Sequence, residues 1–406
     1  MAITEHGTTA YAALPKPERK GTALALSGGG FRAALFHLGA LRRLNELGVL
    51  SRVDTFSSVS GGSILAAFMM EQLSRWPEPG SIAPQWDERL AGPFKRFAAT
   101  NIRTWPVAKR LLPWNWLKST TAVEALAATY RKRVSGRLLA DLPERPCFIF
   151  CATDLPFAVN WIFERARVGD YQAGYASPPQ EWLVARAVAA SSCFPPVFSP
   201  LPIGLRPDQL RGGKAPPGRE RDKIVRSIRL SDGGVYDNLG LEPVWKDHAV
   251  LLASDGGATF DAGPDRGFFW RLQQYAAVMN RQAGAIRKRW LISSFIQGDL
   301  DGTYWGIGSS AASYAFSGGY SENLVDRVVS EVRTDFDAFS EAEQAVLENH
   351  GYILAEAAIR RHAPELISGE ALPYSVPNQD WMDEERVRKA LLSSHRRTLL
   401  GRWSRA

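Results

Sequence analysis

The hydrophobic residues near the N-terminus follow two alternating spacings, one typical of strands and the other typical of helices. The apolar run at 22–26 predicts a strand, and apolar residues three and four positions apart predict a helix over 31–47. Gly48 then favours a helix end. A second strand is predicted at 53–57 and a second, apolar helix over 63–73. Two strand–turn–helix units in succession predict an α/β protein with a largely parallel sheet.

Residues 76–120 interrupt this pattern, because they contain six prolines and five tryptophans with basic residues between them. We expect this segment to form a helical insertion or cap over the sheet. The sheet resumes near Phe148, and apolar runs predict further strands at 225–230 and 249–253. An exposed loop is expected before them, over 204–223.

Further helices are predicted in the second half of the chain. Apolar spacing favours helices over 185–192 and 268–290. Ser340 and Glu343 have the spacing of a capping box, so a helix is expected from there toward His362.

The composition of the 406 residues, with 45% hydrophobic and 22% charged residues, is that of an ordinary globular protein. It excludes a disordered chain, a collagen-like chain and a disulfide scaffold. The formal charge of +7 and the 13 tryptophans suggest an anionic or interfacial partner. There are three cysteines, no signal peptide and no apolar segment of about 20 residues, so we expect a cytoplasmic protein that meets a membrane from one side if at all.

Ser60 stands between the second predicted strand and its helix, in the sequence SVSGG. A serine on a sharp strand-to-helix turn projects its hydroxyl above the sheet, and small neighbours keep the turn uncrowded. This is the pattern of a nucleophile elbow, G-x-S-x-G, with Ser58 in place of the first glycine and with Gly61 and Gly62 after the serine. The alternative is an ordinary serine near a helix N-terminus, where serine is favoured anyway.

Three glycines, Gly28, Gly29 and Gly30, lie between the first strand and the first helix. They leave N–H groups bare at the positive end of a helix, which suits an oxyanion or a phosphate. The sequence is neither a P-loop nor G-x-G-x-x-G. Arg32 is mildly unfavourable in the first helical turn, so we expect it to bind an anion or to brace a loop. The alternative is an exposed or salt-bridged arginine.

A serine nucleophile needs a base. None of the six histidines stands in a glycine-rich turn at a strand end, whereas Asp232 and Asp255 both do, each within the sequence SDGG. A Ser–Asp dyad is chemically sensible because a carboxylate can accept the serine proton directly. The turn chemistry alone leaves both aspartates as candidates.

Four segments, in this order, resemble the patatin-like phospholipases. They are SGGGFR at 27–32, SVSGGS at 58–63, the helix-then-proline sequence ARAVAASSCFPPVFSP at 185–200, and DGGVYDN at 232–238. That family consists of α/β lipid acyl hydrolases with a Ser–Asp dyad, and the likeness spans about residues 22–300. The resemblance implies a three-layer α/β sandwich with a central, mostly parallel sheet, and no metal or other cofactor.

The resemblance also implies roles for residues. Ser60 would be the nucleophile and Asp232 its base, preferred to Asp255 because an asparagine, Asn238, follows closely in the family's Asp-Gly-Gly motif. Gly233 and Gly234 would support this turn. The oxyanion loop would comprise Gly28, Gly29, Gly30, Phe31 and Arg32, with the N–H groups of Gly29, Gly30 and Phe31 as the expected donors.

The expected function is therefore a lipid acyl hydrolase of the phospholipase A type, acting on a phospholipid or another acyl-ester lipid. One alternative is a soluble esterase or thioesterase with the same dyad, and another is a catalytically silent lipid-binding protein. Nucleic acid is not expected as a partner, because no recognised binding motif accompanies the positive charge.

The insertion is a candidate for peripheral contact with a membrane, since tryptophan favours the headgroup region and basic residues favour anionic lipid. The candidate residues are Trp105, Lys109, Arg110, Trp114 and Trp116. Alternatively, these tryptophans fill the core of a small subdomain. The expected organisation is a polar tail (1–20), a catalytic domain (21–335, with 76–120 as the insertion) and a helical C-terminal extension (336–406).

Overall fold

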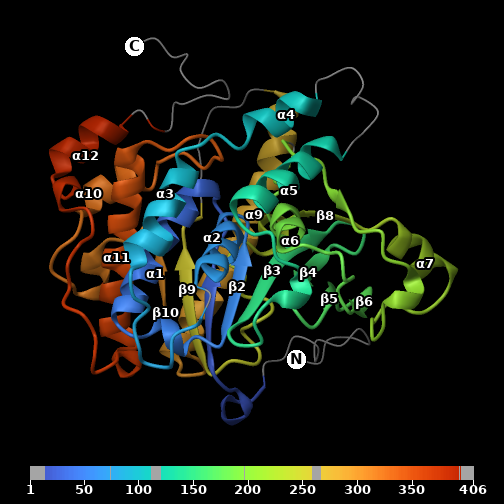
Figure 1. Cartoon of the computed structure of the whole chain (residues 1–406), viewed down its shortest axis with the longest axis horizontal. Coiled ribbons are helices and arrows are strands. Elements are labelled where there is room, and N and C mark those ends of the chain that lie inside the picture. The colour runs from blue at the N-terminus through green and yellow to red at the C-terminus, as the bar shows by residue number, and fades with distance from the viewer. Residues whose placement is uncertain are drawn as a thin grey trace.

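A mixed ten-stranded sheet forms the centre of the molecule (Figure 1). The computed structural model describes residues 14–392 apart from 74, 111–119, 196 and 258–266, together with Ser394. The strands follow the order β10-β9-β1-β2-β3-β4-β5-β6, and β8 pairs with β3 and β7. Their bounds are β1 Thr22–Leu26, β2 Thr55–Val59, β3 Cys147–Asp154, β4 Val159–Phe163, β5 Val168–Asp170, β6 Gly174–Ala176, β7 Leu201–Pro202, β8 Arg229–Asp232, β9 Val250–Asp255 and β10 Asp301–Gly306.

Five neighbouring strands, β10, β9, β1, β2 and β3, are parallel to one another. Every residue of β1 and β2 is buried, which is usual for parallel strands covered on both faces. Beyond β3 the sheet continues antiparallel through β4, β5 and β6. The predicted α/β class with a mostly parallel central sheet is confirmed.

Helices cover both faces of this sheet (Figure 1). Leu24 and Leu26 of β1 join a core with α1, α2 and α11, whereas Ala23 and Ala25 face a second core that includes Leu291 of α9. The helix bounds are α1 Gly30–Glu46, α2 Gly61–Gln72, α3 Gly92–Ala98, α4 Thr104–Arg110, α5 Thr121–Arg133, α6 Val184–Ser191, α7 Arg219–Arg226, α8 Gly234–Asp237, α9 Phe268–Ile296, α10 Glu322–Leu324, α11 Glu341–His362 and α12 Glu384–Leu391. The sheet is thus the middle of three layers.

Helix α11 packs backbone to backbone against α1. A Cβ atom on Gly39 of α1 would lie 1.8 Å from the carbonyl oxygen of Glu348, and one on Gly351 would lie 1.8 Å from that of Phe36. Ser340 caps α11 in a capping box with Glu343, as its sequence predicts. The first helix of the expected C-terminal extension therefore belongs to the same core as the first strand–helix unit.

Two predicted elements differ from the observed ones. The strand predicted at 225–230 is wrong in its first part, because Val225 belongs to α7 and β8 begins only at Arg229. The sequence RERDK, expected as part of a loop, forms the start of α7. Glu220 and Asp222 lie in the first turn of this helix, and Lys223 and Arg226 lie in its last turn. The second strand lies two residues later than predicted, since β2 pairs with β3 up to Val59.

Candidate active site

The strand β3 brings Ser60 and Asp232 together. On one edge, its residues 147–151 pair with β2 in parallel register, ending at Val59 opposite Cys151. The next residues of β3 pair with β8 in antiparallel register, ending at Asp232 opposite Ala152. Because β4 occupies the other edge over residues 150–154, β2 and β8 share one edge of β3. The carboxyl ends of these two strands meet there. Their ends place Ser60 and Asp232 side by side.

Ser60 adopts the strained backbone of a nucleophile elbow, with φ 49° and ψ −113°. A non-glycine residue in this region costs about 1–3 kcal/mol and persists only where the surroundings hold it. Its N–H donates to Ser191 Oγ at 2.9 Å, and its carbonyl oxygen accepts from the N–H of Ile64 at 3.0 Å. Ser58 fits the position of the first elbow glycine because its hydroxyl donates to the carbonyl of Ile149 in β3.

Glycine is required after the serine because the oxyanion loop crosses there. A Cβ atom on Gly61 would lie 2.1 Å from the carbonyl oxygen of Gly30, and one on Gly62 would lie 2.4 Å from that of Leu26. Both contacts involve backbone atoms, which cannot rotate away. The elbow and the loop after β1 therefore form one closely packed unit.

Replacing Gly61 by alanine should push these two segments apart and lower kcat on a soluble ester by about 10²–10³-fold, the usual cost of a misplaced oxyanion donor. The measurement is steady-state turnover together with a thermal melt. Gly284→Ala is the matched control, because Gly284 also lies in a helix and nothing would contact its Cβ within 4 Å. It should leave turnover unchanged, and equal losses in both variants would contradict the prediction.

The Asp232 carboxyl is buried and lies next to the Ser60 hydroxyl. It accepts a hydrogen bond from the N–H of Gly234 at 2.7 Å, and the nearby side chain of Ser60 favours its ionised form. Burial raises the pKa of Asp232 to about 7, although the N–H of Gly234 and the side chain of Ser60 both lower it. A carboxyl group that titrates near neutral pH suits a general base.

Asp255, the other candidate base, has the opposite environment. Burial alone would raise its pKa, but the ammonium group of Lys288 at 2.5 Å and the hydroxyl of Tyr304 at 2.8 Å lower it overall. The buried Asp255 carboxylate is therefore held ionised by a partly exposed lysine. The geometry agrees with the preference for Asp232.

Three buried or half-buried histidines have other partners. His37 bonds to Ser254 Oγ and to the carbonyl of Ser27, His350 bonds to the carbonyl of Ile307, and His248 bonds to Thr55 and Val244. Burial lowers the pKa of both His37 and His350 to about 4. The arrangement is therefore consistent with a Ser–Asp pair; His6 and His395 lie outside the described residues.

Two N–H groups of the predicted oxyanion loop donate hydrogen bonds to distant backbone carbonyls. The N–H of Gly28 donates to the carbonyl of Asn238, and that of Phe31 donates to the carbonyl of Asp335, each at 2.9 Å. The expectation that Phe31 supplies a free donor is therefore wrong, because a long-range contact saturates it. Within the described residues, the N–H groups of Gly29 and Gly30 have no hydrogen-bond acceptor.

Arg32 links this loop to two other segments of the backbone. Its buried guanidinium donates to the carbonyl of Gly256 and to those of Ser330 and Val332. Burial lowers the pKa of Arg32 to about 10, partly offset by Asp255 and Glu331. Of the roles predicted for Arg32, the contacts are those of a loop brace.

Asn238 links the oxyanion loop to the turn that carries Asp232. Besides accepting from Gly28, it directs its side-chain nitrogen at the carbonyl of Gly28 at 3.5 Å. A Cβ atom on Gly234 would lie 2.7 Å from Asn238 Oδ1. Gly233 donates its N–H to the carbonyl of Ser191, whose hydroxyl holds Ser60. These contacts connect the backbone around Ser60 with the backbone around Asp232.

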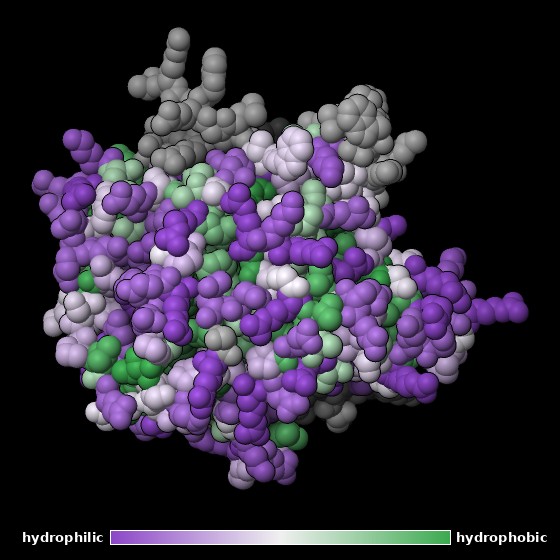
Figure 2. Space-filling view, viewed as in Figure 1, coloured by the Kyte–Doolittle hydropathy of each residue, from purple (hydrophilic) through white to green (hydrophobic). Residues whose placement is uncertain are grey.

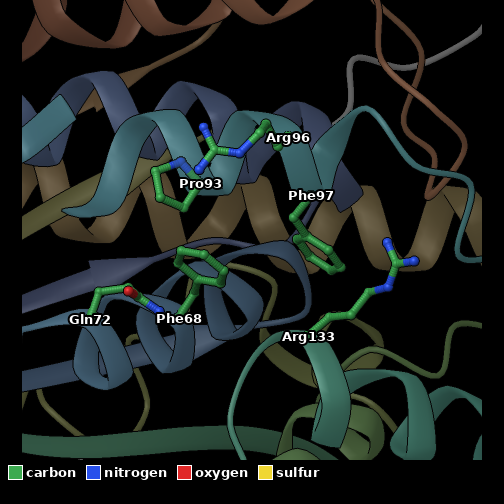
Figure 3. Close-up of a pocket in the computed structure, with 6 residues that line it drawn as sticks. All are labelled: Phe68, Gln72, Pro93, Arg96, Phe97 and Arg133. Atoms are coloured by element: carbon green, nitrogen blue, oxygen red, sulfur yellow. The ribbon is translucent and has the colours of Figure 1, made fainter. Parts of the chain in front are cut away.

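A pocket of about 350 Å³ lies between α2, α3 and α5 (Figure 3). It is lined by Phe68, Gln72, Pro93, Arg96, Phe97 and Arg133. The ring of Phe97 packs edge-on against the ring of Phe31, with centroids 5.4 Å apart. Phe97 thus lines this pocket and also contacts a residue of the predicted oxyanion loop. Apolar walls and two guanidinium groups suit an amphiphile that carries an anionic group.

The tryptophans of the insertion have different environments. Trp86 is buried, and Trp76 packs its ring against Phe56 and Phe148, so these two belong to the core. Trp105 on α4 is 67% exposed. In the view of Figure 2 the surface is mostly hydrophilic, with apolar residues in small patches. No described helix is long and apolar enough to cross a bilayer.

The other residues predicted to contact a membrane are described less fully. Lys109 lies on α4. Trp114 and Trp116 fall outside the described residues, as does the side chain of Arg110.

A strained serine turn, a buried aspartate and a glycine-rich loop meet at one end of a mostly parallel α/β sheet. The sequence model of the patatin-like phospholipases matches residues 24–245, which is more than half of the chain. The chain belongs to the patatin-like phospholipase family, and this membership supports lipid acyl hydrolase activity. The matched range contains Ser60, Asp232 and the three glycines after β1.

Several solved structures are distantly similar to the chain. Human GIVD cytosolic phospholipase A2 has 13% identity and a TM-score of 0.44, covering 94% of this chain and 61% of its own. Its complex with methyl gamma-linolenyl fluorophosphonate has 14% identity and a TM-score of 0.43, covering 94% and 60%. VipD from Legionella pneumophila has 15% identity and a TM-score of 0.35, covering 93% and 75%. The chain thus spans about 61% of the length of the human enzyme. No curated protein matches the sequence.

Proposed function

We propose that this protein is a phospholipase A-type acyl hydrolase that cleaves fatty-acyl esters through Ser60 and Asp232. The observation that carries the proposal is the position of a strained elbow serine beside a buried carboxyl whose pKa is about 7. Among the residues that the structure describes, no cation neutralises that carboxyl, unlike the one of Asp255. Such a pair is suited to proton transfer rather than to stabilising the fold.

In the proposed reaction, Asp232 accepts the hydroxyl proton while Ser60 Oγ forms a bond to the ester carbonyl carbon. The carbonyl oxygen takes the electron pair and is held by the N–H groups of Gly29 and Gly30. The bond to the alcohol then breaks, and Asp232 returns the proton to the leaving oxygen. Water attacks the acyl group on Ser60, Asp232 accepts its proton, and the proton passes to Ser60 Oγ as the fatty acid leaves.

The pocket lined by Phe97 and Arg133 supports a lipid rather than a small polar ester as substrate. Its apolar walls would hold hydrocarbon, and its arginines would attract a phosphate or carboxylate. Membrane contact through Trp105 and the rest of the insertion belongs to the same proposal, because the ring of Trp105 is exposed.

A fluorophosphonate probe tests the nucleophile, because it reacts with the activated serine of a serine hydrolase. We expect one adduct, on the peptide that contains Ser60, and hydrolysis of a long-chain phospholipid in preference to a short ester or an acyl thioester. Preference for the short ester or the thioester would favour a soluble esterase or thioesterase. Absence of the adduct on Ser60 and of all turnover would favour a silent lipid-binding protein.

A further inference from the structure

A segment late in the chain, residues 330–339, packs against the oxyanion loop. It precedes α11 and lies outside residues 24–245, which the family model matches. The carbonyl of Asp335 accepts the N–H of Phe31 at 2.9 Å. A Cβ atom on Gly30, whose φ is 60°, would lie 2.6 Å from the same carbonyl oxygen. The backbone of Asp335 therefore lies directly against Gly30, one of the two candidate oxyanion donors.

The side chain of Asp335 binds the insertion. Its carboxylate pairs with the guanidinium of Arg103, and both side chains are nearly buried, with 11% and 6% of their surface exposed. The other carboxylate oxygen accepts the N–H of Phe336 at 2.7 Å. One residue thus contacts the oxyanion loop through its carbonyl and the insertion through its carboxylate.

Backbone hydrogen bonds and aromatic rings join the same three segments. Ile102 of the insertion donates its N–H to the carbonyl of Phe336 at 3.0 Å. The N–H of Phe339 donates to the carbonyl of Ala98 at 2.9 Å. The ring of Phe31 packs edge-on against the rings of Phe336 and Phe339, with centroids 5.8 Å and 6.0 Å apart. The insertion is therefore connected to the oxyanion loop through residues 335–339.

The pair of Arg103 and Asp335 fixes a position more than it stabilises the fold. Removing two charges from water offsets most of the energy of their attraction. A charge-assisted bond to a guanidinium is nevertheless directional, so it holds the residue that carries the carboxylate in one place. The carbonyl of Asp335 belongs to that residue and contacts the oxyanion loop. A displacement of about 1 Å in such a site can lower a rate by about a hundredfold.

We propose that Asp335 is a positioning residue for the oxyanion hole, and that Arg103 holds it in place. Asp335 acts through the backbone of Gly30 and Phe31 rather than on the substrate. The placement of the insertion thereby controls the geometry of the hole. This inference rests on the proposed function, because the hole stabilises the charge that develops during ester hydrolysis.

The test compares Asp335→Asn, Arg103→Gln and the variant that carries both changes with the parent protein. Asparagine keeps a side-chain oxygen to accept the N–H of Phe336 and loses only the charge. Glu356→Gln is the matched control, because Glu356 belongs to another buried ion pair, with Arg43 at 2.8 Å where α1 and α11 pack. Arg103→Lys keeps the positive charge and tests for rescue.

Three quantities are measured for each variant: kcat and KM on a soluble ester, amide hydrogen exchange of a peptide covering residues 28–34, and the melting temperature. We expect kcat to fall about tenfold in Asp335→Asn and in Arg103→Gln, with KM unchanged. The double variant should lose no more than either single variant, because both changes break the same contact. Exchange of the peptide should be about tenfold faster in all three.

Arg103→Lys should retain most of the turnover, and Glu356→Gln should change the melting temperature without changing kcat. Unchanged kcat and unchanged exchange in the folded Asp335→Asn and Arg103→Gln variants would overturn the proposal. Additive losses in the double variant, or an equal loss in Glu356→Gln, would also overturn it. If the parent protein hydrolyses no ester, the proposed function fails, and the exchange measurement still decides whether Arg103 and Asp335 hold the loop.

Discussion

Replacing Ser60 by alanine should abolish ester hydrolysis, with kcat reduced by a factor of about 10⁴–10⁶. The substitution removes the proposed nucleophile and changes little else. The backbone N–H of residue 60 still donates to Ser191 Oγ, and the alanine methyl group occupies the place of the serine Cβ. The measurement is turnover of a soluble short-chain ester, followed by reaction with a fluorophosphonate, which should no longer label this peptide.

Ser227→Ala is the matched control for this experiment. Ser227 is exposed, and its hydroxyl donates only to the carbonyl of Ile224 at the end of α7. Its loss should leave kcat unchanged. The Ser60→Ala variant should melt close to the parent protein, because alanine retains the strained backbone that glycine would relax. Substantial turnover by the folded Ser60→Ala variant would exclude Ser60 as the nucleophile.

The elbow could be predicted from the sequence because its requirements are local. A short apolar strand, small residues at 58, 61 and 62 and an apolar helix are visible within twenty residues. The meeting of β2 and β8 on one edge of β3 could not be predicted from the sequence, since it depends on strand pairing between distant segments. The motif around Asp232, rather than any spacing from Ser60, indicates this aspartate in the sequence. The register of the sheet supplies the physical reason that the two residues meet.

The local sequence does not reveal which N–H groups of the predicted oxyanion loop are free to donate. Three glycines and Phe31 at a helix N-terminus present four N–H groups, and nothing nearby in the sequence distinguishes them. The carbonyls of Asn238 and Asp335 remove two of the four. The sequence likewise allows Arg32 to bind an anion. In the structure, its guanidinium donates to backbone carbonyls instead. Long-range backbone contacts therefore decide which donors remain.

Helix α9 is a different case, because its composition is visible in the sequence but its exposure is not. Apolar residues over 268–290 predict a helix, and Leu291 near its end packs against the sheet. The helix is longer than the strands that it connects, so its first half has no sheet to cover. Only the position of Asn280 beside Gly234 shows which residues project beyond the site.

Asp232→Asn should also abolish hydrolysis, with kcat reduced by about 10³–10⁴-fold, because an amide cannot accept the serine proton. In the parent protein, kcat/KM on a soluble ester should rise with pH and reach half its maximum near pH 7, since burial raises the pKa of Asp232 to about 7 and only the ionised carboxylate acts as base. A pH profile flat between 5 and 9 would contradict this role.

The same substitution should stabilise the fold at alkaline pH. The pKa of Asp232 is about 7 in the folded protein and close to its ordinary value of 3.8 in the unfolded chain. The folded state therefore binds the proton more tightly, and the cost of the buried charge appears as pH rises from about 4 and is complete above 7. The Asp232→Asn variant should melt above the parent protein at pH 8 and near it at pH 4.

Asp255→Asn provides the opposite control, because Lys288 and Tyr304 lower the pKa of Asp255 and its ionised form stabilises the fold. Losing that charge should lower the melting temperature at pH 8, where the stabilisation is fully present, and the difference should shrink as acid protonates the parent carboxyl. Replacing a structural carboxylate by an amide should therefore lower the melting temperature at pH 8, whereas replacing a catalytic one should raise it. If Asp232→Asn and Asp255→Asn both destabilise at pH 8, Asp232 is a structural carboxylate and the dyad is wrong.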